Sequence, residues 1–309
     1  MPRSIRLALA FVTLGFILRG PMIAAASVQG SFERTYSVTG AVDLEVQNQS
    51  GDISIRSGPP GGVTIRGKIH VADRWLSGNR RGDVEEIEKD PPIQQSGNSI
   101  RIDYLNHHDI SVDYEITVPP DTVLRTHSGS GNQRLEGLRG TIDLETGSGD
   151  LRLRDLVSSH MSLHSASGDI VAGDISGAFT AETGSGDVRV EEKGEGDVHI
   201  RTGSGRIEVR GMRGALWAES GSGNADISGI NTGPWQVTTG SGNVDLSLPP
   251  EAAFDLEAAT RSGSVTTDRA VSMTVQGDLR KSEHTIRGKV AGGGPELSVH
   301  TGSGDIRIH

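Results

Sequence analysis

The chain has 309 residues, of which 43 are glycine, 4% are aromatic and none is cysteine. Its formal net charge of −10 argues against a general nucleic-acid binder, which needs a basic stripe, and against electrostatic docking to an anionic membrane. Without cysteine the fold cannot use disulfides, so its stability must come from packing and backbone hydrogen bonds.

The N-terminal segment has the layout of a secretory signal. Arg3 and Arg6 supply the positive start, Leu7–Leu18 the apolar core and Ala24–Ala26 a small-residue cleavage site. The apolar run is too short to span a bilayer comfortably, and no second apolar segment lies near the C-terminus. We therefore expect residues 1–26 to be a signal peptide. The mature chain is expected to be exported to the periplasm, the cell surface or the medium, without a membrane span.

Residues 27–125 form a less regular region. Alternating apolar residues predict strands near 42–46, 53–55, 63–65, 100–102 and 112–118. The charged stretch Gly82–Glu88 fits either a short helix or a solvated loop. Because a stack of repeats must hide the exposed edge of its end, we expect 27–125 to be an irregular β region that caps the repeats that follow.

From residue 126 onward one motif recurs. The segment Thr183–Val190, TGSGDVRV, is a clear copy of it. The second glycine of each copy is Gly131, Gly149, Gly168, Gly186, Gly205, Gly223, Gly242, Gly263 or Gly304. The first six intervals are 18 or 19 residues, and the last two are 21 and 41 residues. Such a short period predicts a solenoid, in which each repeat is one coil stacked on the next.

Each coil carries the pattern of two short strands. Apolar residues occupy alternate positions after the glycine corner, as at Leu151 and Leu153, and before it, as at Ile142 and Leu144. With so few residues in each coil and no helical pattern, consecutive coils must pair in parallel. We predict an all-β fold in which residues 126–309 form a single-stacked parallel β-solenoid with coils of about 18–19 residues.

Near the C-terminus the pattern becomes irregular. Pro249 and Pro250 interrupt the coils, and Leu256 and Ala258 keep the inward positions of a bulged coil. Residues 265–300 are expected to contain one degenerate coil. The final strand, Asp305–His309, is expected to leave an open edge that can pair with another copy of the chain.

The order of these features resembles a bacterial family of uncharacterised domains catalogued as putative adhesins (DUF4097-like). The segments that carry the resemblance are Ile116–Pro119, Ser128–Asn132, Gly147–Asp150, Ser167–Asp169, Gly184–Asp187 and Gly302–Asp305. The resemblance implies a β-solenoid exported to the envelope or surface, and it supplies no catalytic motif.

The residue after each corner glycine forms an outward column. Its members are Asn132, Asp150, Asp169, Asp187, Arg206, Asn224, Asn243, Ser264 and Asp305. Short polar side chains commonly hydrogen-bond the backbone of their own turn, and this is the role we predict. The alternative is calcium, which repeated Gly-Asp corners bind in other β-rolls at half this period. Because Arg206 interrupts the column, no cofactor is expected.

A second outward column is acidic in the middle coils, at Glu208, Asp226 and Asp245. If the coils are in register, these carboxylates lie on successive strands about 5 Å apart. They should raise one another's pKa unless a cation or an arginine compensates. A solvated acidic stripe is the simplest interpretation. A cation site and a glycosidase-like carboxylate pair are the alternatives.

Trp217 lies at an outward position on the other strand of its coil, where it can stack on a sugar ring, although single exposed apolar residues also occur without function. The sequence contains no nucleophile elbow, phosphate loop or zinc spacing. We therefore predict a non-enzymatic scaffold with an adhesin-like binding or structural role in the cell envelope. Its expected partner is an envelope glycan or a surface protein, not nucleic acid. The alternatives are a polysaccharide-active enzyme using Asp226 and Asp245, and a self-assembling structural protein.

Overall fold

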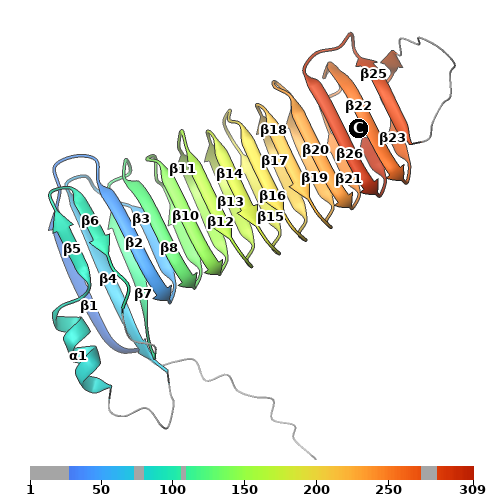
Figure 1. The fold of residues 1–309 in the computed structure, drawn as a ribbon. Helices are drawn as coiled ribbons and strands as arrows, with labels where there is room; N and C mark the ends of the chain where they lie inside the picture. The colour runs from blue at the N-terminus through green and yellow to red at the C-terminus, as the bar shows by residue number, and fades with distance from the viewer. Residues whose placement is uncertain (1–27, 73–79, 106–108, 273–283) are drawn as a thin grey trace, which may run out of the picture.

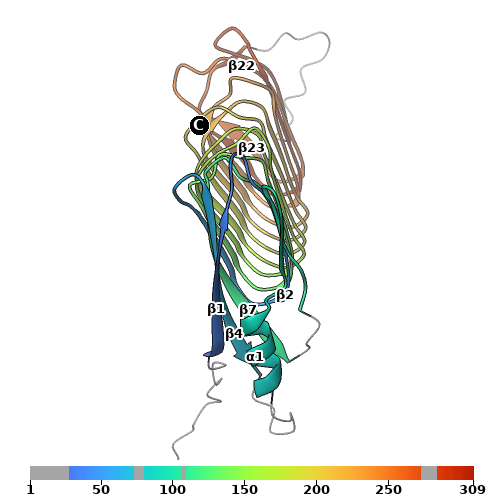
Figure 2. The same ribbon diagram turned by 90° about the vertical axis from the view of Figure 1, so that its left-hand side faces the viewer.

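The computed structural model describes residues 28–72, 80–105, 109–272 and 284–309. The predicted signal peptide at 1–26 lies outside these residues. The described chain forms an elongated stack of strands with one long sheet on each side and a helix, α1 (Arg81–Lys89), at one end (Figure 1). Viewed along the stack, successive coils overlie one another around a narrow interior (Figure 2).

Each side of the stack is one continuous sheet. Sheet A contains, in spatial order, β1 (Val28–Ser37), β4 (Gly62–Val71), β7 (Ile110–Val118), β3 (Ile53–Ser57), β9 (Gln133–Glu136), β11 (Leu151–Val157), β13 (Ile170–Ser176), β15 (Val188–Glu192), β17 (Ile207–Arg213), β19 (Ala225–Ile230), β21 (Val244–Ser247), β27 (Ile306–Ile308) and β23 (Val265–Thr267). Sheet B contains, from the same end, β5 (Ile93–Ser96), β6 (Ser99–Ile102), β2 (Asp43–Ser50), β8 (Val123–Ser130), β10 (Ile142–Ser148), β12 (Met161–Ser165), β14 (Phe179–Thr183), β16 (Val198–Thr202), β18 (Leu216–Ser220), β20 (Trp235–Ser241), β26 (Glu296–Ser303), β22 (Phe254–Ser262), β25 (Thr285–Val290) and β24 (Val271–Ser272).

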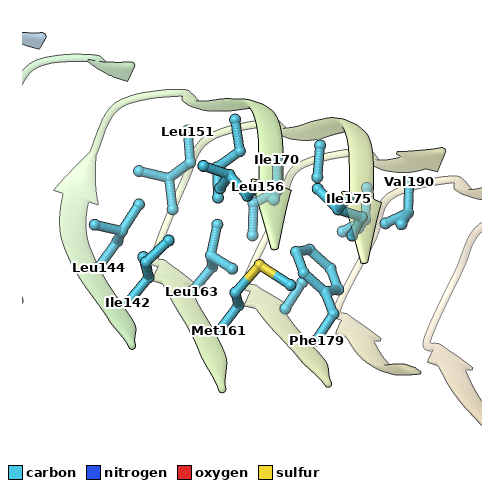
Figure 3. Packing of buried hydrophobic residues seen from close by; sticks show 14 of the residues in the cluster. Ile142, Leu144, Leu151, Leu156, Met161, Leu163, Ile170, Ile175, Phe179 and Val190 are labelled. Atoms are coloured by element: carbon cyan, nitrogen blue, oxygen red, sulfur yellow. The ribbon is translucent and has the colours of Figure 1, made fainter. Parts of the chain in front are cut away.

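The strands of successive coils pair in parallel, in the register that the repeat predicts. In sheet A, Leu151 lies opposite Gln133 on one side and Ile170 on the other. The apolar positions predicted on both sides of each corner are all buried, and side chains from the two sheets interdigitate in the interior (Figure 3). The predicted all-β, solenoid-like architecture is therefore confirmed.

The corner glycines are required by the close approach of successive coils. A Cβ on Gly186 would overlap the carbonyl oxygen of Gly168, and a Cβ on Gly168 would overlap that of Gly149. The same overlap recurs along the column, whereas among these corners only Gly131, Gly263 and Gly304 have a positive φ. Close backbone contact is thus the general reason for glycine at this position.

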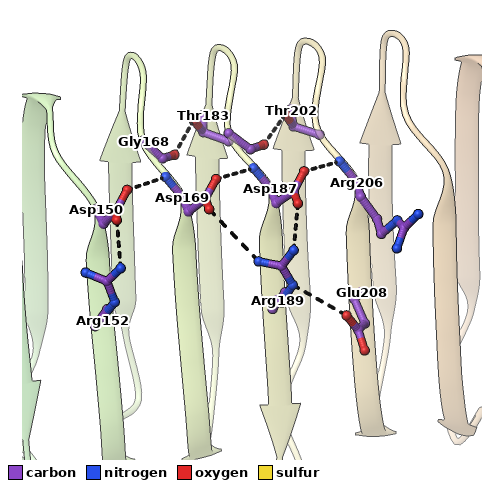
Figure 4. Close-up of polar contacts among 11 residues, drawn as sticks. Asp150, Arg152, Gly168, Asp169, Thr183, Asp187, Arg189, Thr202, Arg206 and Glu208 are labelled. Carbon is purple, nitrogen blue, oxygen red and sulfur yellow. Dashed lines mark hydrogen bonds and ion pairs between the residues drawn. The ribbon is translucent and has the colours of Figure 1, made fainter. Parts of the chain in front are cut away.

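The threonine that opens the motif has a structural role that the sequence pattern did not explain. The buried hydroxyl of Thr183 donates to the carbonyl of Gly168 at 2.9 Å, and that of Thr202 donates to the carbonyl of Gly186 at 2.9 Å (Figure 4). Each bond joins a coil to the preceding one. It also satisfies a polar group inside the core, where an unpaired hydroxyl would be costly.

The predicted open edge at Asp305–His309 is wrong. Strand β27 is paired on both sides, with Ile306 opposite Val244 of β21 and Val265 of β23. Strand β26 is likewise held between β20 and β22. The coil β26–β27 therefore fits between two coils that precede it in the sequence, and its backbone groups already have partners.

The degenerate coil expected within 265–300 is also not found in the described parts of that range, 265–272 and 284–300. These residues hold β23, β24, β25 and the start of β26, and β25 runs antiparallel to β22. An antiparallel strand turns the chain back and cannot continue the coil. This short antiparallel arrangement instead covers the edge of sheet B at this end of the stack.

The opposite end is closed in a similar way. The coil β2–β3 lies between the later strands β6–β7 and the first coil of the regular repeats, β8–β9. Antiparallel β4 and β1 extend sheet A beyond it. The stretch Gly82–Glu88 is part of helix α1, which buries Val84 and Ile87, and Glu88 Oε1 accepts a hydrogen bond from Ser31 N of β1 at 2.7 Å.

One carboxylate interrupts the apolar interior. Glu192 is only 4% exposed and occupies the position that Ile175 fills in the neighbouring coil. Its Oε2 accepts a hydrogen bond from Arg213 N at 3.3 Å, and its Oε1 has no partner among the described residues. Burial, opposed by that hydrogen bond and assisted by the charge of Asp197, raises the pKa of Glu192 from 4.5 to about 7.

Replacing Gly186 by alanine should destabilise the stack. The added methyl group would overlap a backbone oxygen that cannot rotate away, and we expect a loss of about 3 kcal/mol of unfolding free energy, as for overpacked cores. Gly173→Ala is the matched control, because a Cβ there would meet nothing within 4 Å. Urea unfolding measures both variants, and equal midpoints would contradict the close-approach explanation.

Replacing Glu192 by glutamine should stabilise the protein at alkaline pH but not at acidic pH. A carboxyl whose folded pKa is raised loses stability as the pH increases from about 4.5 to about 7, and the full penalty of up to about 3 kcal/mol remains above pH 7. The melting temperature of Glu192→Gln should therefore exceed that of the parent protein at pH 8 and match it at pH 4. The exposed neighbour supplies the control, Glu191→Gln, which should show no such crossover.

Candidate functional site

The structure brings the three acidic candidates together on the outer face of sheet A. Glu208 of β17 lies opposite Asp226 of β19, and Asp226 lies opposite Asp245 of β21. They line a shallow hollow of about 270 Å³. The coil β26–β27, here called the inserted coil, lies next to β20–β21. The next residue in this row is therefore Arg307 of β27, opposite Asp245.

Basic side chains surround this acidic row. Arg189 Nε lies 3.6 Å from Glu208 Oε2, and Arg206 Nε lies 3.7 Å from Asp226 Oδ2. Asp245 Oδ1 lies 3.8 Å from His309 Nε2. Arg210 also pairs with Glu208. The row is therefore compensated largely from within the chain.

Asp226 nevertheless holds its proton more tightly than an isolated aspartate. Burial raises its pKa, the neighbouring charges of Asp245 and Glu208 raise it further, and Arg206 opposes the shift. Among the described residues, no group of three or more His, Cys, Asp or Glu side chains is arranged to hold a metal ion. Chemically, the row therefore offers one carboxyl group with a raised pKa, that of Asp226. It lies beside the carboxylates of Glu208 and Asp245, which have partners.

The corner column forms a ladder between coils. Oδ1 of Asp150 accepts a hydrogen bond from Asp169 N at 3.0 Å, and Oδ1 of Asp169 accepts one from Asp187 N at 2.9 Å (Figure 4). The prediction that these side chains bind the backbone of their own turn is therefore wrong, because each side-chain oxygen accepts from a backbone N–H of the next coil. Asparagine serves equally well, since Asn243 Oδ1 accepts from Asp305 N at 2.9 Å.

The ladder is interrupted at Arg206 and resumes at Asn224, whose Oδ1 accepts from Asn243 N at 2.9 Å. A guanidinium has no acceptor, so the backbone of the next corner, at Asn224, cannot be bound in this way. Arg206 instead extends to Asp226 in the acidic row. In the preceding coil, Arg189 of β15 bridges Asp187 at 2.7 Å and Glu208 at 3.6 Å. The corner carboxylates are therefore committed to backbone donors and arginines, which is a structural role.

Trp217 lies on the opposite side of the molecule, on the outer face of sheet B. Its ring stacks on that of His199, with centroids 3.9 Å apart and planes inclined by 32°. The two residues are register partners on adjacent strands β16 and β18. Gln236 of β20 is the partner of Trp217 on the other side.

Trp217 borders a hollow of about 620 Å³, which is larger than the hollow of about 270 Å³ at the acidic row. Residues that precede strands of sheet B contribute the apolar side chains Ala178, Ala215 and Pro234. Polar side chains line it as well: Thr180, Asp197, His199, Gln236, Glu296 and Ser298. The sequence pattern singled out only Trp217 here, although the 18-residue spacing of His199 and Trp217 already equals one coil. Glu296 and Ser298 could not be foreseen, because they belong to the inserted coil.

A model of the Toastrack DUF4097 family matches residues 33–309. The chain belongs to this family. The predicted resemblance is thus confirmed over almost all of the described residues. No curated protein matches the sequence of this Toastrack chain. In its described part, no helix combines the length and the apolarity needed to cross a membrane.

Solved structures of bacterial proteins are similar to this Toastrack chain. A putative adhesin from Bacteroides fragilis is 13% identical with a TM-score of 0.32, over 91% of this chain and 98% of that one. A putative adhesin from Parabacteroides merdae is 9% identical with a TM-score of 0.34, over 91% and 97%. A putative cell adhesion protein from Clostridium sporogenes is 12% identical with a TM-score of 0.23, over 90% and 98%.

The ladder predicts that position 169 of this Toastrack protein needs an acceptor and not a charge. Asp169→Ala removes the partner of Asp187 N and should cost about 1 kcal/mol of unfolding free energy, the net value of one hydrogen bond. Asp169→Asn keeps the acceptor and should remain close to the parent. Chemical denaturation compares the two, and an equal loss in both would point to charge in place of the ladder.

Proposed function

We propose that this protein is an adhesin-like binding scaffold that acts without catalysis in the cell envelope. The observation that carries the proposal is the hollow of about 620 Å³ beside the half-buried Trp217 on the outer face of sheet B. Apolar concavities with a few convergent polar groups are typical of ligand sites. The rigid strands beneath hold the lining residues at fixed spacing.

The placement of the two candidate surfaces supports binding over catalysis. Trp217 lies on sheet B, whereas Asp226 and Asp245 lie on sheet A, so the carboxylates do not face the hollow. A glycosidase needs its two carboxyl groups on either side of the bond that it cleaves. A ligand held at Trp217 would therefore be out of reach of the acidic row.

The proposal includes the arrangement expected from the sequence. Residues 1–26 direct export, residues 27–125 close one end, and residues 126–309 provide the binding face as a single stack of coils of about 18–19 residues. The partner is an envelope glycan or a surface protein. Location in the periplasm or on the cell surface follows from the proposed export.

The second candidate function is polysaccharide cleavage at Asp226 and Asp245. The raised pKa of Asp226 favours it, because a general acid must keep its proton near neutral pH. Against it stands the ion pairing of Asp226 with Arg206, which stabilises the charged form. Self-assembly through Asp305–His309 is not a candidate, since β27 has no free edge.

The test is a combined binding and turnover assay with the purified protein. Insoluble peptidoglycan and envelope polysaccharides should retain the protein, and prolonged incubation should release no soluble fragments. Fragment release that disappears in Asp226→Asn and Asp245→Asn would replace the proposal by the enzyme. Failure of every glycan and of isolated surface proteins to retain the protein would overturn the binding role.

A further inference from the structure

We infer that the Trp217 hollow holds an uncharged pyranose ring, stacked on the face of the indole that His199 leaves open. This inference rests on the proposed binding function and names the site and the ligand class. It is argued from the stacking of the two rings, the small residues next to them and the charges around the hollow.

The aromatic pair leaves one ring face available. Strand β18 lies between β16 and β20, and the stacked imidazole of His199 covers the indole from the β16 side. The other face of Trp217 is directed toward β20, where its neighbour Gln236 is exposed. The negative face of an indole attracts groups with partial positive charge, such as the C–H groups on one face of a pyranose.

Small residues provide the space for such a ring. Ala215 immediately precedes β18 and lines the hollow together with Trp217, two positions later, because side chains of an extended chain alternate between its two faces. Pro234 precedes Trp235 of β20 in the same row, and Glu296 follows on the inserted strand β26. A ring stacked on Trp217 would therefore rest on short apolar side chains, beyond which polar groups begin.

The polar groups around the hollow match hydroxyl groups. The Gln236 amide provides donors and an acceptor, and the hydroxyl of Ser298, its register partner on β26, provides both. Ser298 Oγ already lies 3.1 Å from His300 Nε2, which orients it. These two side chains lie beside the open face of Trp217, where they can bind the ring hydroxyls.

The charge of the hollow disfavours acidic sugars. Asp197 and Glu296 are exposed carboxylates at its border, and Glu296 has no ion-pair partner among the described residues. Asp197 Oδ1 accepts a hydrogen bond from Ala215 N at 3.0 Å, so it is fixed there. Among the described residues, the only basic side chain in the lining is that of His199. Uronic acids and phosphorylated sugars would meet like charge, and neutral sugars would not.

His199 acts here as a positioning residue. Its ring holds the indole upright by packing against one face, and a flat replacement can do the same. The variant His199→Phe should therefore retain ligand affinity, whereas His199→Ala should weaken it. A residue that bound the ligand through its ring nitrogens would lose affinity in both variants.

The experiment is calorimetric titration of the purified protein with neutral hexaoses of glucose, mannose, galactose and N-acetylglucosamine, and with hexagalacturonate as the acidic probe. At least one neutral hexaose should bind and hexagalacturonate should not. Trp217→Ala should weaken binding by roughly tenfold or more, the effect of removing one stacking contact. Arg152→Ala, on the outer face of sheet A, is the control and should bind as the parent does.

Each result separates the site from the general function. Unchanged affinity in a folded Trp217→Ala variant would overturn the site while leaving the binding scaffold in place. Preference for hexagalacturonate would overturn the ligand class. Absence of binding to every hexaose would overturn this inference, and the scaffold would then depend on the retention assay with whole envelope material. Melting temperatures of all variants show whether a loss reflects unfolding.

Discussion

The structure depends on one contact, the approach of each glycine corner to the carbonyl oxygen of the corner before it. This approach is possible only without a side chain, as at Gly186 above Gly168. Once the corners are this close, Thr183 reaches the same carbonyl from inside and Asp169 reaches the next backbone N–H from outside. In coils that have all three, these short-range constraints fix the register, and a register error would place the apolar residues outside.

Fixed register leaves the outward positions free to differ from coil to coil. Residues one coil apart in the sequence become neighbours on adjacent strands, as His199 and Trp217 do on sheet B and Glu208 and Asp226 do on sheet A. The two faces consequently carry different chemistry. One presents compensated charge, and the other presents an aromatic pair above small residues, so a binding surface could arise on one side without disturbing the core.

The sequence specified the coil interior because alternation and period are local signals. Leu151, Leu153 and their equivalents were predicted from spacing alone. The partner of Asp169 was missed, because a periodic sequence does not show whether a side chain binds its own turn or the next one. The order of the last coils was missed for a related reason: the corners at Gly263 and Gly304 are equivalent in sequence, and only long-range pairing places the second directly against Gly242. Only part of the Trp217 hollow could be predicted from the sequence, because Glu296 reaches the hollow only through that unexpected order of coils.

The inserted coil also changes how the stack can unravel. In a simple solenoid the outermost coil has one neighbour and one covalent connection, so fraying begins there and proceeds inward. Here the outermost complete coil, β22–β23, is joined to β21 on one side of the sequence and to β24 on the other. Peeling it away must displace the antiparallel β25 and strain the connection to β26, which is held inside the stack. The outermost coil is therefore connected to the rest of the stack at two points of the chain, and this opposes unfolding of one coil at a time from this end.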